Sequence, residues 1–392
     1  MLEYYWRYSK KVKAVPPLII TMNDTKYWVG FNLIPGIGRV RFSLLEKHFG
    51  DMASAWHAPA SELKAAGLEP KIVQAVVNHR PRISLEEEME KLERLHTRVL
   101  TWKDKAYPPR LKEIYDLPPV LYVRGSLLPD DEWAVAVVGT RRSTIYGRQV
   151  AEDLVTDLAR HKITIISGLA RGIDTVAHRA ALEAGGRTIA VLACGLDQVY
   201  PPENAQLARD IMEHGALVSE QPLGMPPRAD YYPRRNRIMS GMSLGTLVVE
   251  AGETSGALIT ARLANEQNRE VFAVPGSILS PNSQGTNYLI QEGAKLVRNY
   301  QDILEELNLS MAAQQLEMKE LLPPTDTESQ LLRRLSTEPV HVDEVCRASG
   351  LPVSLVSSTL AMMELKGMIR QVGGMNYILT KEAREEYRVK VE

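Results

Sequence analysis

Two arginines follow an apolar run at a place where a nucleotide-binding loop would carry more glycines. The run Val135–Val138 ends at Gly139, and the chain continues with Thr140, Arg141 and Arg142. A loop that follows a strand of an α/β sheet often holds a phosphate, and the arginine guanidinium binds phosphate oxygens through paired hydrogen bonds. Gly139, Thr140 and Arg141 are therefore candidates for holding a phosphate, whereas Arg142 is better explained as a solvated neighbour or an ion-pair partner.

Further anion-binding signals follow at the ends of other apolar runs. Ser167 and Gly168 end one run and Gly172 precedes a helical pattern, so free backbone amides there could meet an oxygen anion. The segment 228–241 (RADYYPRRNRIMSG) adds two tyrosines, whose ring faces can stack on bases, and five polar side chains: Arg228, Arg234, Arg235, Asn236 and Arg237. So many arginines suit a chain of phosphates better than a single mononucleotide.

Catalytic motifs are missing from the sequence: it holds no nucleophile elbow, no His-Glu-x-x-His, no Walker A loop and no Cys/His cluster. Asp174 and His178 form a suggestive pair, because residues four apart share a helix face. They are either a general base with its orienting carboxylate or a network that shapes the Ser167–Gly168 loop. Since no nucleophile or metal ligand accompanies them, the structural network is favoured, and neither enzymatic activity nor a cofactor nor a metal is expected.

Composition describes an ordinary globular protein with a local rather than a general basic character. The chain has 392 residues, 44% of them apolar and 24% charged, which fits two or three domains. A net charge of −1 excludes a generally cationic surface, so a polyanion site must be a local cluster of arginines. Cys194 and Cys346 are far apart and fit reduced thiols in a cytoplasmic protein. Residues 1–20 lack a long apolar run, so neither a signal peptide nor a membrane span is expected.

The elements that must position these residues begin with short helices over about residues 20–90. Between two amphipathic stretches, Pro35–Gly38 forms a Pro-Gly-Ile-Gly turn, and its glycines permit a tight helix-to-helix connection. Two interpretations are equally open: a helix-hairpin-helix (SAM-like) module that offers backbone amides to a nucleic-acid phosphate, or a plain helical turn in a packing domain.

The middle region alternates apolar runs with helical segments, the most regular of which are 147–160, 173–184 and 257–268. Near-continuous apolar strands separated by helices indicate a mostly parallel sheet covered on both faces, with ligands beyond the C-terminal strand ends. We therefore predict an α/β domain with a doubly wound, mostly parallel sheet. The predicted strands are 98–102, 120–125, 133–139, 163–167, 188–193, 216–219, 246–251 and 271–276.

The C-terminal part begins with an acidic segment that carries paired prolines, which we interpret as a linker. Three helical patterns and a hairpin at Gly373-Gly374 then predict a winged helix. Its third helix, about 354–366, holds one lysine (Lys366) and one glutamate (Glu364), so docking or attenuated DNA binding is favoured over base reading. The predicted domains are 1–92 (helical), 93–308 (Rossmann-like), 309–326 (linker) and 327–392 (winged helix).

Long stretches of the chain resemble the DNA-processing protein A family (DprA, also called Smf). The stretches include VVGTRRSTIYG, SGLARGIDTVAHRAALEAGGRTIAVLACGLDQVYPPEN, YYPRRNRIMSGMS, VVEAGETSGALITARLA and VPGSILSPNSQGTNYLIQEGA. The likeness runs through about residues 95–300, and the flanking modules match the layout of longer members. It implies a homodimeric protein with an extended Rossmann-like central domain and without established catalytic turnover, which binds single-stranded DNA in natural transformation. It also implies that the protein protects that strand and loads the RecA recombinase onto it.

The resemblance assigns roles to individual residues. It places the family's phosphate pocket on Gly139, Thr140 and Arg141 and the base-stacking aromatic on Tyr232, while the block Arg235–Arg237 lines or braces the pocket. Two positions depart from the family, which often has a lysine at Ala229 and a basic residue at Pro202. The residues that could supply the missing charge are Arg171, Arg228 and Arg234.

Two rival functions remain. The first is a nucleoside-monophosphate phosphoribohydrolase on a related Rossmann-like fold, whose Pro-Gly-Gly-x-Gly-Thr run is followed two residues later by a glutamate. Here Ser243–Thr246 lacks the double glycine, and Glu250 follows after three intervening residues. The second is a dimeric adaptor that recruits partners through its end modules and binds no DNA.

Overall fold

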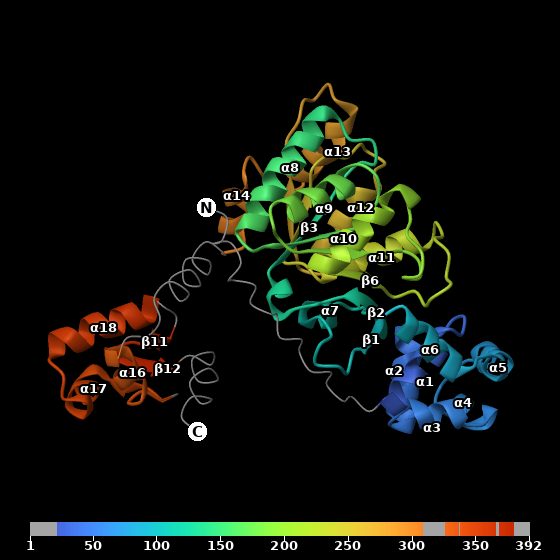
Figure 1. The fold of residues 1–392 in the computed structure, drawn as a ribbon, viewed down its shortest axis with the longest axis horizontal. Helices are drawn as coiled ribbons and strands as arrows, with labels where there is room; N and C mark the ends of the chain where they lie inside the picture. The colour runs from blue at the N-terminus through green and yellow to red at the C-terminus, as the bar shows by residue number, and fades with distance from the viewer. Residues whose placement is uncertain (1–21, 309–325, 337, 366–367, 380–392) are drawn as a thin grey trace, which may run out of the picture. The chain divides into compact units, whose positions relative to one another are not determined.

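The computed structural model describes residues 22–308, 326–336, 338–365 and 368–379 (Figure 1). The chain divides near residue 298 into two compact units, which are described separately. Most of the predicted linker, 309–325, and Lys366 lie outside the described residues.

The first unit contains a nine-stranded sheet in the order β1-β2-β6-β5-β4-β3-β7-β8-β9. The strands from β6 to β9 are parallel, whereas β1 and β2 run antiparallel at one edge. All eight predicted strands are present, and the additional strand β9 is only two residues long. The bounds are β1 (Arg98–Thr101), β2 (Val120–Gly125), β3 (Ala134–Val138), β4 (Thr164–Ser167), β5 (Thr188–Val191), β6 (Ala216–Ser219), β7 (Gly245–Val248), β8 (Glu270–Ala273) and β9 (Lys295–Leu296).

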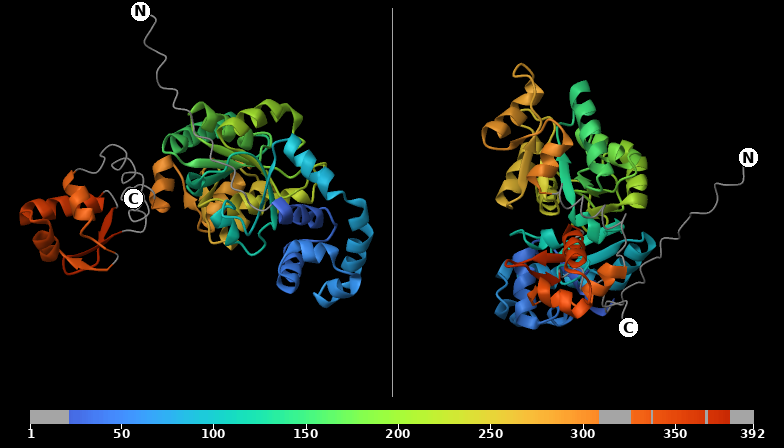
Figure 2. Two further views of the ribbon diagram at one scale, coloured as in Figure 1. Left: turned by 60° about the horizontal axis from the view of Figure 1, so that its bottom comes forward. Right: turned by 90° about the vertical axis from the view of Figure 1, so that its left-hand side faces the viewer.

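Helices cover both faces of this sheet, as a doubly wound fold requires (Figures 1 and 2). Successive strand residues face opposite cores: Ala190 and Leu217 belong to one apolar cluster, and Val191 and Val218 to the other. The strands are therefore apolar along their whole length, which is why they could be predicted from the sequence. The helices are α7 (Pro109–Lys112), α8 (Ile145–Arg160), α9 (Ile173–Glu183), α10 (Ala205–His214), α11 (Tyr231–Gly241), α12 (Gly256–Glu266) and α13 (Gln284–Gln291).

A bundle of short helices precedes the sheet and packs on its β1–β2 edge. Trp28 stacks on Phe42 at 5.2 Å between ring centroids and meets Trp102, just after β1, edge-on at 5.5 Å. The Asn32 amide donates to the Tyr122 hydroxyl of β2 at 3.2 Å. The boundary at residue 92 stays a prediction, because bundle and sheet share one core. The helices are α1 (Met22–Asn32), α2 (Arg39–Phe49), α3 (Met52–His57), α4 (Ala60–Ala65), α5 (Pro70–His79) and α6 (Leu85–Arg94).

The second unit ends in the predicted winged helix. Its three short strands pair in the order β10-β12-β11, and the hairpin turns at Gly373 and Gly374, whose positive φ values of 97° and 55° suit glycine. Among the described residues, no single helix has the length and apolar character to cross a membrane; α17 and α18 meet that test only as a pair bent by 115°. The elements are α14 (Tyr300–Glu306), α16 (Asp326–Leu332), β10 (Val340–His341), α17 (Val342–Ser349), α18 (Val353–Leu365), β11 (Ile369–Gln371) and β12 (Asn376–Leu379).

Candidate nucleic-acid interface

The loop after β3 is held against the loop after β4. The Thr140 amide donates to the Glu250 carbonyl at 2.8 Å, and the Thr140 carbonyl accepts from the Ile173 amide at 3.3 Å. Gly172, with φ of 76°, makes this approach possible, because a Cβ at that position would overlap the Thr140 carbonyl oxygen. The two loops therefore place Arg141 beyond the C-terminal ends of the central strands, where an α/β sheet binds its ligands.

Arg141 and Tyr232 meet at this edge. The guanidinium carbon of Arg141 lies 5.2 Å from the centroid of the Tyr232 ring, a cation–π contact. Arg141 is exposed and Tyr232 is half-buried, at the start of α11. Burial raises the pKa of the Tyr232 phenol; Tyr200 adds to the rise, and Arg141 and Arg235 oppose it. The phenol is thus neutral near pH 7, and the pair offers a ring beside a positive charge.

Arg235 lies beneath the Arg141–Tyr232 pair and braces it. Its side chain is buried, and its Nη1 donates to the carbonyls of Gly168 at 2.6 Å and Val191 at 2.5 Å. A Cβ at Gly168 would overlap this guanidinium, which explains the glycine at the end of β4. Burial lowers the pKa of Arg235, and the nearby Asp174 raises it. Arg235 therefore ties the ends of β4 and β5 together and adds positive potential from below.

Asp174 shapes the β4 loop, in agreement with the structural network that the sequence predicts. Its Oδ2 accepts from the amides of Gly168 at 3.1 Å and Ala170 at 3.3 Å, so the Gly168 amide already has a partner. His178 contacts Thr188 Oγ1 through Nδ1 at 2.7 Å rather than Asp174. Burial lowers the pKa of His178 to about 3, which keeps the ring neutral. The Ser167 hydroxyl is also buried and donates to the Val137 carbonyl at 2.6 Å.

Three of the remaining predicted arginines form ion pairs, and the fourth forms none with another described residue. Arg237 is buried in an ion-pair network with Glu220 and with Asp116, whose Oδ2 lies 3.2 Å from Arg237 Nε. Arg171 forms an ion pair with Glu203. Arg228 pairs with Asp230 at 3.1 Å and its guanidinium carbon lies 5.2 Å from the centroid of the Tyr231 ring. Arg234 is exposed on α11 and forms no salt bridge to another described residue.

Two further residues at this edge were not predicted as site residues. Tyr200, with 47% of its surface exposed, raises the pKa of Tyr232 by its proximity and adds a second aromatic ring to the region. The sequence could have indicated Tyr200 as a site residue, because it lies in the loop after a predicted strand. The second residue, Glu250, occupies the point between β3 and β7 where the strand order reverses.

The Glu250 carboxylate is bound to the start of α8. Its Oε2 accepts from the Thr144 amide at 2.9 Å and its Oε1 from the Thr144 hydroxyl at 2.6 Å. Glu250 is 2% exposed, and a Cβ at Gly147 would overlap its carboxylate. A Rossmann fold usually places a nucleotide phosphate at such a helix N-terminus. Here a carboxylate of the protein fills that position, which explains why the β3 loop needs no dinucleotide glycine pattern.

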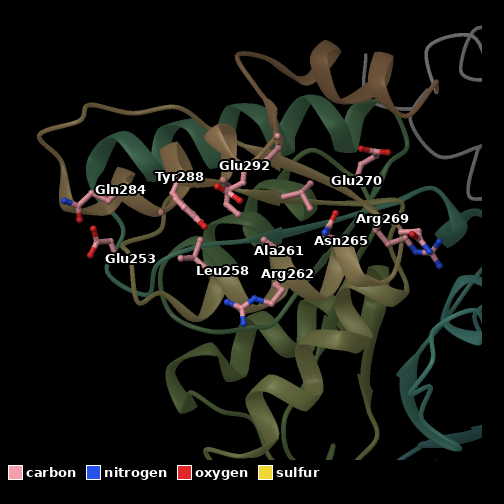
Figure 3. A pocket seen from close by; sticks show the side chains of 16 residues that line it. Glu253, Leu258, Ala261, Arg262, Asn265, Arg269, Glu270, Gln284, Tyr288 and Glu292 are labelled. Carbon is pink, nitrogen blue, oxygen red and sulfur yellow. The ribbon is translucent and has the colours of Figure 1, made fainter.

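A separate hollow of about 830 Å³ lies between α12 and α13, beside the β8–β9 edge of the sheet (Figure 3). Its lining mixes charges, with Arg262 and Arg269 near Glu270 and Glu292. None of the predicted phosphate or base contacts lines it. In the part of the chain that the structure describes, no group of three or more His, Cys, Asp or Glu side chains is placed to hold a metal.

The fold and the site define a class: a Rossmann-like protein with an arginine–tyrosine pair at the C-terminal strand edge and an appended winged helix. Residues 98–308 match the family described as DNA recombination-mediator protein A, and residues 315–375 match the DprA winged helix domain. The chain belongs to the DNA recombination-mediator protein A family.

Several relatives support this assignment. Protein Smf of Escherichia coli (strain K12) is 39% identical over 372 residues, covering 92% of this chain and 97% of the relative. DNA processing protein DprA of Bacillus subtilis is 48% identical over 204 residues, 52% of this chain and 69% of its own. The crystal structure of DprA from Streptococcus pneumoniae aligns with a TM-score of 0.64 at 35% identity over 72% of this chain and 97% of that one. A Helicobacter pylori DNA processing protein A structure, titled for its single-stranded DNA binding mode, aligns with a TM-score of 0.50 at 30% identity, over 55% of this chain and 98% of that one.

Proposed function

We propose that this protein binds single-stranded DNA at the Arg141–Tyr232 pocket and acts as a recombination mediator in natural transformation. The observation that carries the proposal is the 5.2 Å contact between the Arg141 guanidinium and the Tyr232 ring at the C-terminal strand edge. A phosphate and its adjoining base need a cation and a ring face side by side, which this pair supplies. The single-stranded DNA binding named for the Helicobacter pylori relative supports the same ligand.

Each predicted residue has a distinct place in this proposal. Arg141 binds a backbone phosphate with help from the backbone of Gly139 and Thr140, and Tyr232 stacks on a base. Arg234 and Arg228, exposed at the start of α11 and just before it, supply the charge missing at Ala229 and Pro202. The buried residues act from behind the surface as braces of the pocket: Ser167, Gly168, Arg235, Asn236 and Arg237. Arg171 contacts DNA only when its ion pair with Glu203 is broken.

The experiment that tests this function is fluorescence anisotropy of a labelled oligo-dT strand and of a duplex of equal length across a salt series. We expect a preference for the single strand and a steep fall in affinity with salt, with a slope of about 0.7 in log–log terms for each phosphate contact. Little sequence preference is expected, because ring stacking and phosphate contacts read no base edge. Equal affinity for the duplex, or strong selectivity for one short sequence, would contradict the proposal.

The finer parts of the proposal concern partners. We propose that the protein works as a homodimer in the cytoplasm, shields incoming DNA and loads RecA recombinase onto it; the family description as a recombination mediator supports the part played in recombination. Light scattering tests the dimer. The rate of RecA ATP hydrolysis on strands coated with single-strand-binding protein tests the loading, and a rate that does not rise when this protein is added would contradict it.

The phosphoribohydrolase alternative conflicts with the position of Glu250. Its carboxylate is buried and hydrogen-bonded to Thr144 rather than presented to a substrate. Incubation with AMP should therefore release no adenine, and steady release would reinstate the enzyme. An intact dimer that binds no DNA would instead favour the adaptor.

A further inference from the structure

Large apolar side chains are exposed beside the arginines that follow β3. The exposed fractions are 80% for Ile145, 49% for Tyr146, 84% for Ile278 and 88% for Leu279. Single exposed apolar residues are common on proteins, whereas a group of them usually marks a binding surface. Ile145 and Tyr146 begin α8, and Ile278 and Leu279 lie in the loop between β8 and α13 (Figure 1). We call these four residues the apolar tip.

Hydrogen bonds fasten the two segments of the apolar tip to each other. The Tyr146 hydroxyl donates to the Pro275 carbonyl at 2.8 Å, and the Asn282 side chain donates to the Arg142 carbonyl at 3.2 Å. The loop that carries Ile278 and Leu279 is thus anchored to the β3–α8 connection on both sides of its tip.

The same loop is also anchored to the domain beneath it. Asn287 of α13 bonds the Gly276 amide and carbonyl at 3.1 and 3.0 Å. The Ala251 amide, just after β7, donates to the Asn282 carbonyl at 2.8 Å. These hydrogen bonds fix the position of the loop. Its apolar side chains are therefore held in exposed positions on the surface.

The charge around the apolar tip indicates the chemistry of its partner. Segments 139–149 and 275–287 contain three arginines, Arg141, Arg142 and Arg148, and no aspartate or glutamate. All three arginines are exposed. A local cluster of exposed arginines attracts a polyanion, and apolar side chains among the arginines suit a polyanion that also exposes flat apolar groups. Unpaired DNA combines these two properties, whereas in a duplex the bases are stacked inside.

We propose that the apolar tip contacts unpaired bases of the same DNA strand as it leaves the Arg141–Tyr232 pocket, with Arg142 and Arg148 toward its phosphates. The continuity of the chain supports this path, because Arg141 contacts Tyr232 and the next residue, Arg142, accepts the hydrogen bond from the loop that carries Ile278 and Leu279. Aliphatic side chains offer no hydrogen bonds to base edges, so the contact is independent of sequence. The inference rests on the proposed function and extends its binding site.

The experiment compares the full-length protein with the double variant Ile278→Ser/Leu279→Ser on oligo-dT strands of roughly 4 to 20 nucleotides, a range that brackets common single-strand site sizes. Short strands fill only the pocket, so the variant should bind them like the wild type. Longer strands reach the apolar tip, and there the variant should bind about 10-fold more weakly, as expected for the loss of contact with one or two bases. Leu128→Ser is the matched control, because Leu128 is 42% exposed in the connection that precedes β3 rather than in the loop that follows it, and it should leave both affinities unchanged.

Three outcomes would overturn the inference. Equal affinities of variant and wild type at every length would overturn it while leaving the pocket intact. A halved mass in light scattering with unchanged DNA binding would assign the apolar tip to a second copy of this chain. A wild type that binds no strand of any length would overturn the proposed function, and the inference would fall with it. Thermal unfolding of the variant, expected at the wild-type temperature, shows whether an altered affinity comes from the surface or from misfolding.

Discussion

The Arg141 guanidinium lies 5.2 Å from the centre of the Tyr232 ring, although Arg141 lies in the loop after β3 and Tyr232 at the start of α11, which follows β6. Between β3 and β6 in the sheet lie β4 and β5, whose ends are joined by the buried Arg235. The distance between Arg141 and Tyr232 is therefore set by a brace beneath the pair. A cation and a ring held this way are ready to receive a phosphate and its base without a costly rearrangement.

Replacing Arg141 tests the phosphate contact directly. Arg141→Ala should weaken binding of oligo-dT by roughly 10- to 100-fold, because a charge-assisted contact is lost, and should reduce the salt slope by about 0.7. The thermal unfolding temperature should not change, since Arg141 is exposed. Arg142→Ala is the control and should have a much smaller effect on a short strand. Equal effects of the two variants would show a general electrostatic attraction of DNA rather than binding of one phosphate at Arg141.

Tyr232 allows stacking to be separated from hydrogen bonding. Tyr232→Phe keeps the ring and should retain most of the affinity, whereas Tyr232→Ala should lose about 1–3 kcal/mol of binding free energy, the usual value of one stacked base. Anisotropy titrations of the two variants measure the difference. If Phe and Ala were equally weak, the phenol hydroxyl rather than the ring would be the contact.

Arg235 should behave as a brace. Arg235→Ala leaves the buried carbonyls of Gly168 and Val191 without their donor, so the free energy of unfolding should fall by about 2–4 kcal/mol. Urea denaturation measures this loss, and Arg141→Ala, without such a loss, is its matched control. A variant of normal stability that had lost only DNA affinity would show that Arg235 contacts the strand.

The strands were predictable from sequence because both faces of a parallel sheet are buried, so each strand is a near-continuous apolar run. The position of Arg141 at the C-terminal strand edge was also predictable, since the loop after a strand of this kind lies at that edge. Which residues of Arg234–Arg237 are exposed and which are buried was not predictable. Those residues lie on α11, and whether an arginine is exposed like Arg234 or buried like Arg237 depends on Asp116 and Glu220, which are distant in sequence. Likewise, no local pattern shows that Glu250 binds Thr144.

The buried His178 gives a prediction about pH. Burial lowers the pKa of His178 to about 3 in the folded protein, whereas an unfolded histidine has a pKa of about 6.5. Between these values the unfolded chain binds a proton that the folded protein does not, so His178 makes stability fall as pH falls through that window. From pH 7 to pH 5 this contribution is about 2 kcal/mol.

Urea denaturation at both pH values, for the wild type and for His178→Asn, isolates that contribution from those of the acidic residues. Asn can still donate toward Thr188, the present partner of the ring. The wild type should lose about 2 kcal/mol more than the variant between pH 7 and pH 5. Asp174 acts in the opposite direction, because burial raises its pKa, but it is common to both proteins and cancels in the comparison. Equal losses in the two proteins would mean that His178 is protonated within the fold and would contradict the neutral ring inferred from its burial.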